Sequence, residues 1–192
     1  MKIGKTLYVT TRGQWRSWLS KHYKTEPEIW LIYYRKETGK PRISYDDAVL
    51  EALAFGWIDS IEKRIDEARF AQRFSPRRST SSLSPMNKER IAELIKEEKM
   101  TNAGLSAIAH VYDPHNDKKE KFTLPPGILR ALKANKAAWK NFAAMPDSYK
   151  RIRIPYIESR KRHSMGMYQK TLANFVRMTV QNKRIGFVKE RR

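Results

Sequence analysis

The chain contains no cysteine among its 192 residues. Disulfides, thiolate zinc sites, iron–sulfur clusters and cysteine nucleophiles are therefore excluded. Long apolar runs are also missing: the longest, from Ile29 to Tyr34, has six residues, whereas a membrane-spanning helix needs about 20. Residues 1–11 lack the apolar segment of a signal peptide. We expect a soluble, cytoplasmic protein without a membrane span.

Glycine is scarce, with eight residues that never cluster. The chain has no glycine-rich phosphate loop and none of the short motifs typical of dinucleotide-binding folds, serine hydrolases, zinc proteases or EF-hands. These absences favour a non-enzymatic role without a cofactor or a metal. His110, Asp113, His115 and Asp117 do cluster in the sequence. However, a spacing of five residues does not place both histidines on one helical face.

Positive charge is the abundant feature. The chain has 40 Lys and Arg against 20 Asp and Glu, a formal net charge of +20. Residues 1–112 hold 20 basic and 14 acidic side chains, while residues 113–192 hold 20 basic and six acidic ones. Such an excess favours a polyanionic partner such as nucleic acid, and it is concentrated in the second part of the chain.

The first part of the chain mixes strand and helix patterns. Strands are predicted at residues 7–10, 28–36, 61–65 and 69–75. The second is continuously apolar, as in an internal strand, and the last two alternate as in a hairpin. Helices are predicted to begin at the capping residues Thr11, Ser44 and Ser84, and a further helix is predicted over residues 101–112. We expect an α+β domain over residues 1–112, with a small mixed or antiparallel sheet and packed helices.

The second part has helical patterns only. A polar, proline-containing linker is predicted over residues 113–124, followed by a helical domain over 125–192. Pro125 and Pro126 open a helix whose apolar stripe runs through Trp139 to Phe142. A second helix is predicted over 149–162, in which Pro155 should cause a kink or a restart. A third helix is predicted over 164–183.

The segment between the hairpin and the next helix is rich in arginine and hydroxyl groups. Fork-shaped guanidinium donors, neutral donors and the positive end of a helix dipole together suit an anion. The candidate anion-binding residues are Arg73, Arg77, Arg78, Ser81 and Ser84. The alternative is an ordinary solvated basic loop that ends in a helix cap.

Other residues are candidates for the wall of a pocket at this loop. They are Tyr45, Trp57, Asp59, Arg64 and Asn87. An aspartate beside a tryptophan, just past a helix end, could pin an arginine or act as a base at a pocket floor. The alternative is a buried Asp–Arg pair that holds the hairpin to the helix.

The helical part carries two basic clusters with tyrosines between them. The candidate polyanion contacts are Lys150, Arg151, Arg153, Arg160, Lys161 and Arg162. Tyrosines in such a region can stack on bases. The alternative is a solvated basic helix face whose aromatic rings lie in the core.

Several segments together resemble a known family. They are residues 51–60, 64–66, 72–79, 84–90 and 99–104, and the helical part from Pro125 to Arg184. The set is similar to the YdeI/OmpD-associated family, also labelled bacteriocin-protection proteins, and the resemblance extends over nearly the whole chain. It departs at Leu83, where the family usually has tryptophan. The resemblance implies a stress-related protein and carries over no catalytic residue.

Three hypotheses of function follow. The leading one is non-enzymatic binding of an anionic ligand or of nucleic acid at the arginine-rich loop, with added affinity from the basic helices. The second is interaction with an acidic protein in envelope-stress or bacteriocin tolerance, as the family label suggests. The third is an enzyme acting on a phosphorylated or carboxylated small molecule, with Asp59 as acid or base. The oligomeric state stays open.

Overall fold

The computed structural model describes residues 2–113 and 123–186. They form two compact units, one within residues 1–117 and the other within residues 118–192, and each unit is described by itself. The predicted linker over 113–124 falls almost entirely outside the described residues. None of the described helices is long and apolar enough to cross a bilayer.

The first unit contains a four-stranded mixed sheet in the order β1-β2-β4-β3. The strands are β1 (Thr6–Leu7), β2 (Ile29–Tyr34), β3 (Trp57–Arg64) and β4 (Arg69–Pro76). β1 runs parallel to β2, while β4 pairs antiparallel with both β2 and β3. The structure thus confirms the α+β fold, the hairpin and the internal position of the apolar strand.

β3 begins earlier than the sequence predicted. The predicted strand started at residue 61, whereas the observed one starts at Trp57. Gly56 has a φ of 75°, a left-handed conformation that glycine adopts without strain. The preceding helix therefore turns directly into the strand. A register shift between Asp59 and Glu62 interrupts the alternation of side chains in β3 and explains why its first half was missed.

Local capping chemistry sets the helix boundaries in this unit. The helices are α1 (Arg12–His22), α2 (Tyr45–Ala54), α3 (Pro85–Lys96) and α4 (Asn102–Ile108), with a 3₁₀ turn η1 (Lys36–Thr38). Each α-helix begins after a Ser or Thr whose side chain accepts a hydrogen bond from the first helical turn. The three predicted N-caps are confirmed, and Thr101 is a fourth that the sequence did not indicate. α4 is shorter than the predicted helix over 101–112.

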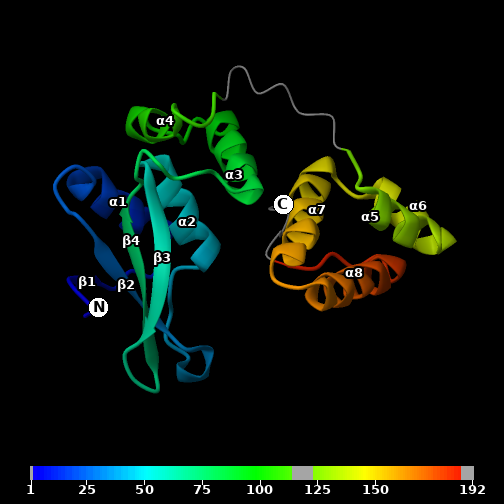
Figure 1. The fold of residues 1–192 in the computed structure, drawn as a ribbon. Coiled ribbons are helices and arrows are strands. Elements are labelled where there is room, and N and C mark those ends of the chain that lie inside the picture. Colours follow the sequence, from blue (N-terminus) through cyan, green and yellow to red (C-terminus); the bar gives the residue numbers. More distant parts are fainter. Residues whose placement is uncertain (1, 114–122, 187–192) are drawn as a thin grey trace. The chain divides into compact units, whose positions relative to one another are not determined.

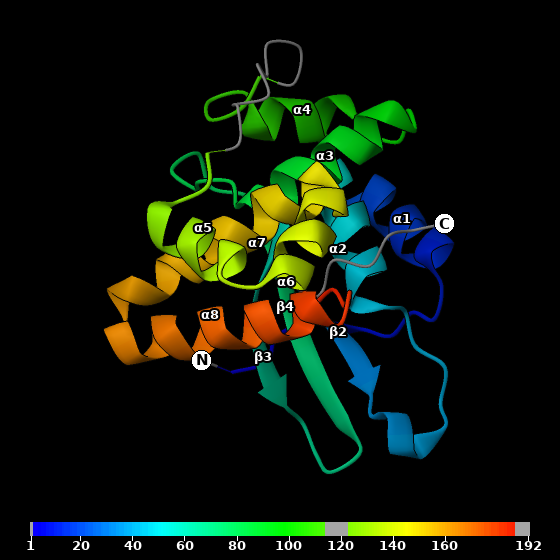
Figure 2. The same cartoon turned by 90° about the vertical axis from the view of Figure 1, so that its right-hand side faces the viewer.

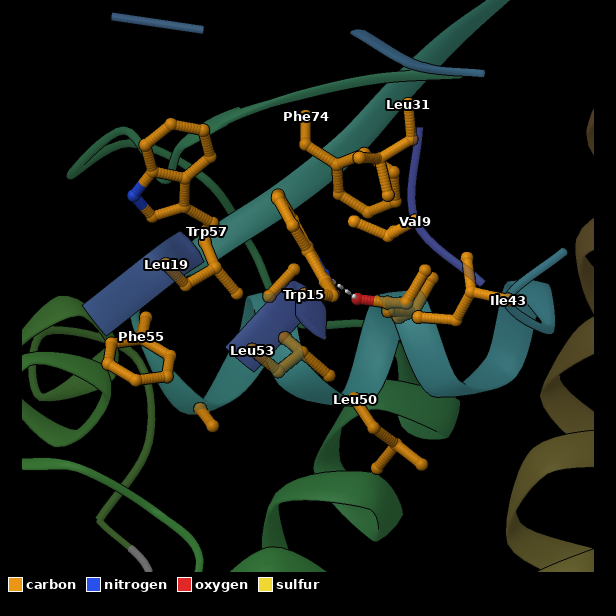
Figure 3. Packing of buried hydrophobic residues seen from close by; sticks show 14 of the residues in the cluster. Val9, Trp15, Leu19, Leu31, Ile43, Leu50, Leu53, Phe55, Trp57 and Phe74 are labelled. Carbon is orange, nitrogen blue, oxygen red and sulfur yellow. Dashed lines mark hydrogen bonds between the residues drawn. The ribbon is translucent and has the colours of Figure 1, made fainter. Parts of the chain in front are cut away.

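Helices α1 and α2 lie on the same face of the sheet (Figure 1). Trp15 of α1 is fully buried between them, and its indole N–H donates to the Ala48 carbonyl of α2 at 3.0 Å (Figure 3). Its ring centroid lies 5.5 Å from that of Phe74 on β4. α3 and α4 pack against α2, and the turn of the β3–β4 hairpin extends beyond α1 and α2 (Figures 1 and 2).

A buried carboxylate joins α1 to α2. Glu51 is 1% exposed and forms ion pairs with Arg12 and, at 2.7 Å, with Arg16. Arg16 also donates to the Lys99 carbonyl at 3.1 Å. The two guanidinium groups compensate the cost of burying this charge, and they fix α1 to both α2 and the end of α3.

The second unit is helical. Its elements are α5 (Pro126–Lys133), α6 (Lys136–Ala144), α7 (Asp147–Ser159), the 3₁₀ turn η2 (Arg160–Arg162) and α8 (Met165–Val180). α8 packs against α5, α6 and α7 (Figure 2). The apolar core includes Ile128, Leu132, Phe142, Tyr149, Ile157 and Phe175.

One sequence prediction for this unit is wrong, and of the two outcomes predicted at Pro155 the restart does not occur. The helix predicted to continue from Pro125 through Phe142 is divided, because the Asn135 side chain accepts from the Ala138 N–H and caps a new helix. Pro155 does not restart α7, which is continuous from Asp147 to Ser159. Buried residues on both sides of the proline, among them Ile154 and Ile157, hold the helix together despite the lost donor.

The Glu51 ion pairs lead to a stability prediction. Glu51→Gln leaves two arginines facing a neutral amide in a largely buried place, and we expect a loss of about 3 kcal/mol in the free energy of unfolding. Urea unfolding of the full chain measures it. The control is Glu67→Gln, because that side chain is 96% exposed and its loss should cost less than about 0.5 kcal/mol. Equal urea midpoints for the two variants would contradict a stabilising role of the Glu51 ion pairs.

Candidate anion-binding site

The arginine-rich loop connects the end of β4 to the start of α3. Its first residue, Arg77, donates its backbone N–H to the Gly56 carbonyl at 2.9 Å, so the loop leaves the sheet beside the start of β3. A turn follows, in which the Ser81 N–H donates to the Arg78 carbonyl at 3.0 Å. The loop ends at Ser84, the N-cap of α3.

The Arg77 guanidinium is buried beneath this loop. The residue is 9% exposed, and its Nη2 donates to the Ser82 carbonyl. Its Nε and Nη1 are buried without a hydrogen-bond partner. No described carboxylate forms an ion pair with it. Burial lowers the pKa of Arg77, because desolvation penalises the charged form. Two of its three nitrogens are therefore donors that the fold does not use.

The start of α3 contributes the partial positive charge of its helix dipole but few free hydrogen-bond donors. The Ser84 hydroxyl oxygen accepts from the Asn87 N–H at 3.2 Å, and the Lys88 N–H donates to the Ser84 carbonyl at 3.0 Å. Pro85 has no N–H to offer. The Ser84 hydroxyl proton and the helix dipole still favour an anion at this end of the helix.

The other two arginines of the predicted set lie apart from Arg77. Arg73 pairs with Glu28 on the neighbouring strand at 2.7 Å and donates to the Ser60 hydroxyl at 3.3 Å. It precedes Arg77 by four residues along an extended strand, a distance of roughly 13 Å. Arg78 is exposed on the loop. Ser81 is half-buried and Ser84 exposed.

The predicted wall residues are held by separate partners. Tyr45 donates its hydroxyl to Asp59 at 2.6 Å, whereas Trp57 is buried in the core and donates its indole N–H to the Tyr23 carbonyl at 3.2 Å. Arg64 is exposed near the hairpin turn and donates to the Asp66 carbonyl at 3.1 Å. Each of these contacts is local to its own part of the first unit.

Asn87 has yet another partner. Its side-chain oxygen accepts from Arg90 at 3.1 Å, and Arg90 pairs with Asp46 at 2.6 Å. These contacts connect the first turns of α3 and α2. The described contacts therefore do not bring Asp59, Trp57 and Arg77 onto one ligand, which is what the enzyme hypothesis requires.

One phenol near Tyr45 and Asp59, that of Tyr33, was missed in the sequence. Tyr33 is 2% exposed, and its buried hydroxyl has no hydrogen-bond partner. Burial raises the pKa of Tyr33, and burial together with the hydrogen bond to Asp59 raises the pKa of Tyr45. Tyr33 stands in a continuous apolar strand, where a hydroxyl among core side chains gives no pattern to detect.

In the second unit, the predicted polyanion contacts are divided between internal and exposed roles. Arg153 is buried and donates to the Ile185 carbonyl. Lys150 donates to the Ala143 carbonyl at 3.0 Å and pairs with Asp147 at 3.2 Å. Arg151 is half-buried.

The second basic cluster is also partly engaged. Lys161 pairs with Glu158 at 2.6 Å, and that hydrogen bond raises the pKa of Lys161. The Arg160 guanidinium lies 4.2 Å from the centroid of the Tyr156 ring. Arg162 is exposed.

Of the residues in the histidine–aspartate cluster, His115 and Asp117 lie outside the described residues. Within residues 2–113 and 123–186, no group of three or more potential metal ligands comes together.

Two family models match the sequence. One, described as "Domain of unknown function (DUF8412)", matches residues 7–107. The other, described as "Bacteriocin-protection, YdeI or OmpD-Associated", matches residues 121–182. The resemblance to the YdeI/OmpD-associated family is thus confirmed for the helical part, while the motifs quoted from the first part lie within the other match. No curated protein and no solved structure matches the chain.

The pair of Glu28 and Arg73 predicts a pH dependence. A hydrogen bond from the Trp30 indole and the Arg73 guanidinium lower the pKa of Glu28 below its ordinary value of 4.5. A carboxylate with a lowered pKa stabilises the fold above its unfolded-state pKa, and this contribution is lost as the pH falls through the folded-state value.

Glu28→Gln removes that contribution. We expect a loss of up to about 1 kcal/mol at pH 7, and the difference from the wild type should shrink as the pH falls below 4.5 towards the lowered folded-state pKa. Urea midpoints measured between pH 3 and 7 test it, with the exposed Glu37→Gln as the control. A difference that stays constant down to pH 3 would contradict the assignment.

Proposed function

The chain belongs to the family described as a domain of unknown function (DUF8412) and carries a YdeI/OmpD-associated domain, and from this starting point we propose that it binds an anion without catalysing a reaction. The binding site is the loop from Arg77 to Ser84. Arg77 is the central donor, the loop hydroxyls are additional donors, and the start of α3 adds its dipole.

The unpaired burial of Arg77 carries the proposal. A guanidinium with no counter-charge costs several kcal/mol when it is removed from water. Other buried or half-buried arginines of this unit, such as Arg12 and Arg90, have a carboxylate partner. An external anion bound to one of the unused donors, Nε or Nη1, would compensate the charge of Arg77 in the same way.

The ligand has to reach nitrogens that the loop covers. Arg78, Ser79, Thr80 and Ser82 are exposed, so the outer side of the loop is in contact with water. The hydrogen bond from Arg77 to the Ser82 carbonyl holds the loop over the guanidinium. A small displacement at Ser82 would open the site, and the hydroxyls of Ser79 and Ser81 would then face the ligand.

The chemistry favours a tetrahedral or planar oxyanion. Arginine forms several parallel hydrogen bonds to phosphate and carboxylate groups, and serine hydroxyls add single donors. Inorganic phosphate is therefore the first probe. It represents the phosphate of a metabolite or of a nucleic-acid end without the rest of such a molecule.

A thermal unfolding experiment with phosphate tests the proposal. At ten times the dissociation constant, a ligand that binds only the folded state adds about 1.4 kcal/mol. For a unit of this size, that shifts the unfolding midpoint by about 5 °C. We expect this shift for the wild type and for Arg78→Gln relative to chloride at equal ionic strength, and no shift for Arg77→Gln.

The unfolding midpoint of Arg77→Gln without phosphate separates a ligand role from a structural one. If the Arg77 guanidinium serves to bind a ligand, its removal leaves the thermal unfolding midpoint in chloride unchanged or higher, because an unpaired buried charge is lost. A fall of many degrees in chloride would mean that Arg77 serves the fold. An equal phosphate shift in Arg77→Gln and Arg78→Gln would also refute the site.

The matched YdeI/OmpD-associated family is described by bacteriocin protection, and a role in stress tolerance is the corresponding proposal for this chain. Binding of an acidic protein through a carboxylate or phosphate at Arg77 would connect the role in stress tolerance with the proposed anion site. Its cytoplasmic location stays a prediction from the sequence.

A further inference from the structure

The corner formed by α5 and α6 presents cations around an exposed tryptophan. We name it the α5–α6 patch, and it consists of Arg130, Lys133, Lys136, Trp139 and Lys140. All five side chains are exposed, and Trp139 is 38% exposed. The sequence placed Trp139 on the buried stripe of one long helix, and the break at Asn135 turns it outward instead.

Helix geometry places these residues on the outer faces of their helices. On α5, Arg130 and Lys133 lie away from the buried Ile128 and Leu132. On α6, Lys136 and Lys140 lie opposite the buried Ala138 and Phe142, and Trp139 lies between these two faces. Lys136 and Lys140 are one turn apart, so their Cβ atoms are about 5–6 Å apart.

Contacts across the corner hold the patch together. The Lys133 ammonium lies 5.4 Å from the centroid of the Trp139 ring, which connects the end of α5 to α6. Trp139 also stacks on the buried Phe142, with ring centroids 6.3 Å apart. The indole is thus supported from the core side and available from the solvent side.

The patch has no counter-charge of its own. Residues 123–146 contain no Asp or Glu, and none of the four cations forms an ion pair with another described residue. The two acidic residues of the described second unit, Asp147 and Glu158, are paired with Lys150 and Lys161. Fourteen Lys and Arg stand against these two carboxylates in residues 123–186, so a large positive potential is unavoidable.

We infer that the α5–α6 patch binds single-stranded nucleic acid. The lysines and Arg130 neutralise successive phosphates, and an unpaired base stacks on the Trp139 ring. In this exchange the Lys133 ammonium leaves the ring face for a phosphate. A duplex would use only the cations, because its base faces are covered by their neighbours. This site lies in a different unit from Arg77 and does not depend on the proposed anion site.

Fluorescence anisotropy of the full chain with a labelled oligothymidine of about 12 nucleotides tests the inference. Neutralising four phosphates on a single strand predicts a slope of log affinity against log salt near about −3. A duplex of the same length is expected to bind more weakly. Binding should also quench tryptophan emission, because the other four tryptophans lie within residues 1–57 and Trp139 alone is in the patch.

Two variants separate stacking from charge. Trp139→Leu keeps an apolar contact with Phe142 and should lower the affinity about tenfold and abolish the quenching, whereas Trp139→Phe should recover part of the affinity. The double variant Lys136→Gln/Lys140→Gln should reduce the salt slope by about 1.4. A thermal melt of each variant verifies that it is folded.

The matched control removes the same charge elsewhere in the unit. Lys170 and Arg177 are exposed on α8, two turns apart. Lys170→Gln/Arg177→Gln should leave both the slope and the affinity close to the wild type. An equal loss in this control would mean non-specific attraction, and the inference would fail. It would fail equally if Trp139→Leu bound as the wild type does, or if the duplex bound more tightly. Arg77→Gln should leave oligothymidine binding unchanged, so the two sites are tested separately.

Discussion

The close approach of backbone segments at Gly56 positions most of the first unit. A Cβ on Gly56 would come within 2.6 Å of the Ala107 side chain, and one on Gly104 would come within 2.4 Å of the Ala54 carbonyl. The end of α2 therefore lies directly against α4. Thr101, which caps α4, donates its hydroxyl to the same Ala54 carbonyl at 2.6 Å. Larger side chains at either glycine would force these segments apart.

That junction also decides where the arginine-rich loop between β4 and α3 begins. The Gly56 carbonyl accepts the Arg77 N–H, so the residue that turns α2 into β3 also fixes the first residue of the loop. The sheet order brings β4 between β2 and β3, and its last residues consequently end beside α2. The position of Arg77 is thus fixed by the junction at Gly56, and the loop completes its burial through the hydrogen bond from the guanidinium to the Ser82 carbonyl.

Interactions between residues close together in the sequence could be predicted, whereas those between residues far apart in the sequence could not. Thr11, Ser44 and Ser84 were recognised as caps because a cap acts on atoms three residues away. The alternation of the hairpin was recognised for the same reason. Partners far apart in the chain were not recognisable: Arg73 pairs with Glu28, and Arg153 binds the Ile185 carbonyl. Either arginine looks like a surface cation until the fold supplies its partner.

The missed tryptophan has a similar cause. Trp139 follows Leu132 by seven residues, and on one uninterrupted helix such a spacing would place both on the same face. Asn135 instead caps a new helix, and Trp139 therefore lies on a different face. The helix propensity of asparagine is only slightly less favourable than that of its neighbours, so the sequence did not indicate this break. For the loop at Arg77, residue types alone suggested an anion site. The missing carboxylate partner, which now carries the proposal, became visible only when all pairs could be located.

The two candidate sites use positive charge under different dielectric conditions. Arg77 is desolvated, so its interaction with an anion is screened little by salt and depends on geometry. The α5–α6 patch is in water, where each cation contributes weakly and the sum falls steeply with ionic strength. The net charge of +20 therefore has different consequences in the two units. In the first unit, carboxylates such as Glu51, Glu28 and Asp46 pair with arginines within the fold. In the second unit the carboxylates are too few to do so, and the remaining charge has to be balanced by ions from solution or by a polyanion that displaces them.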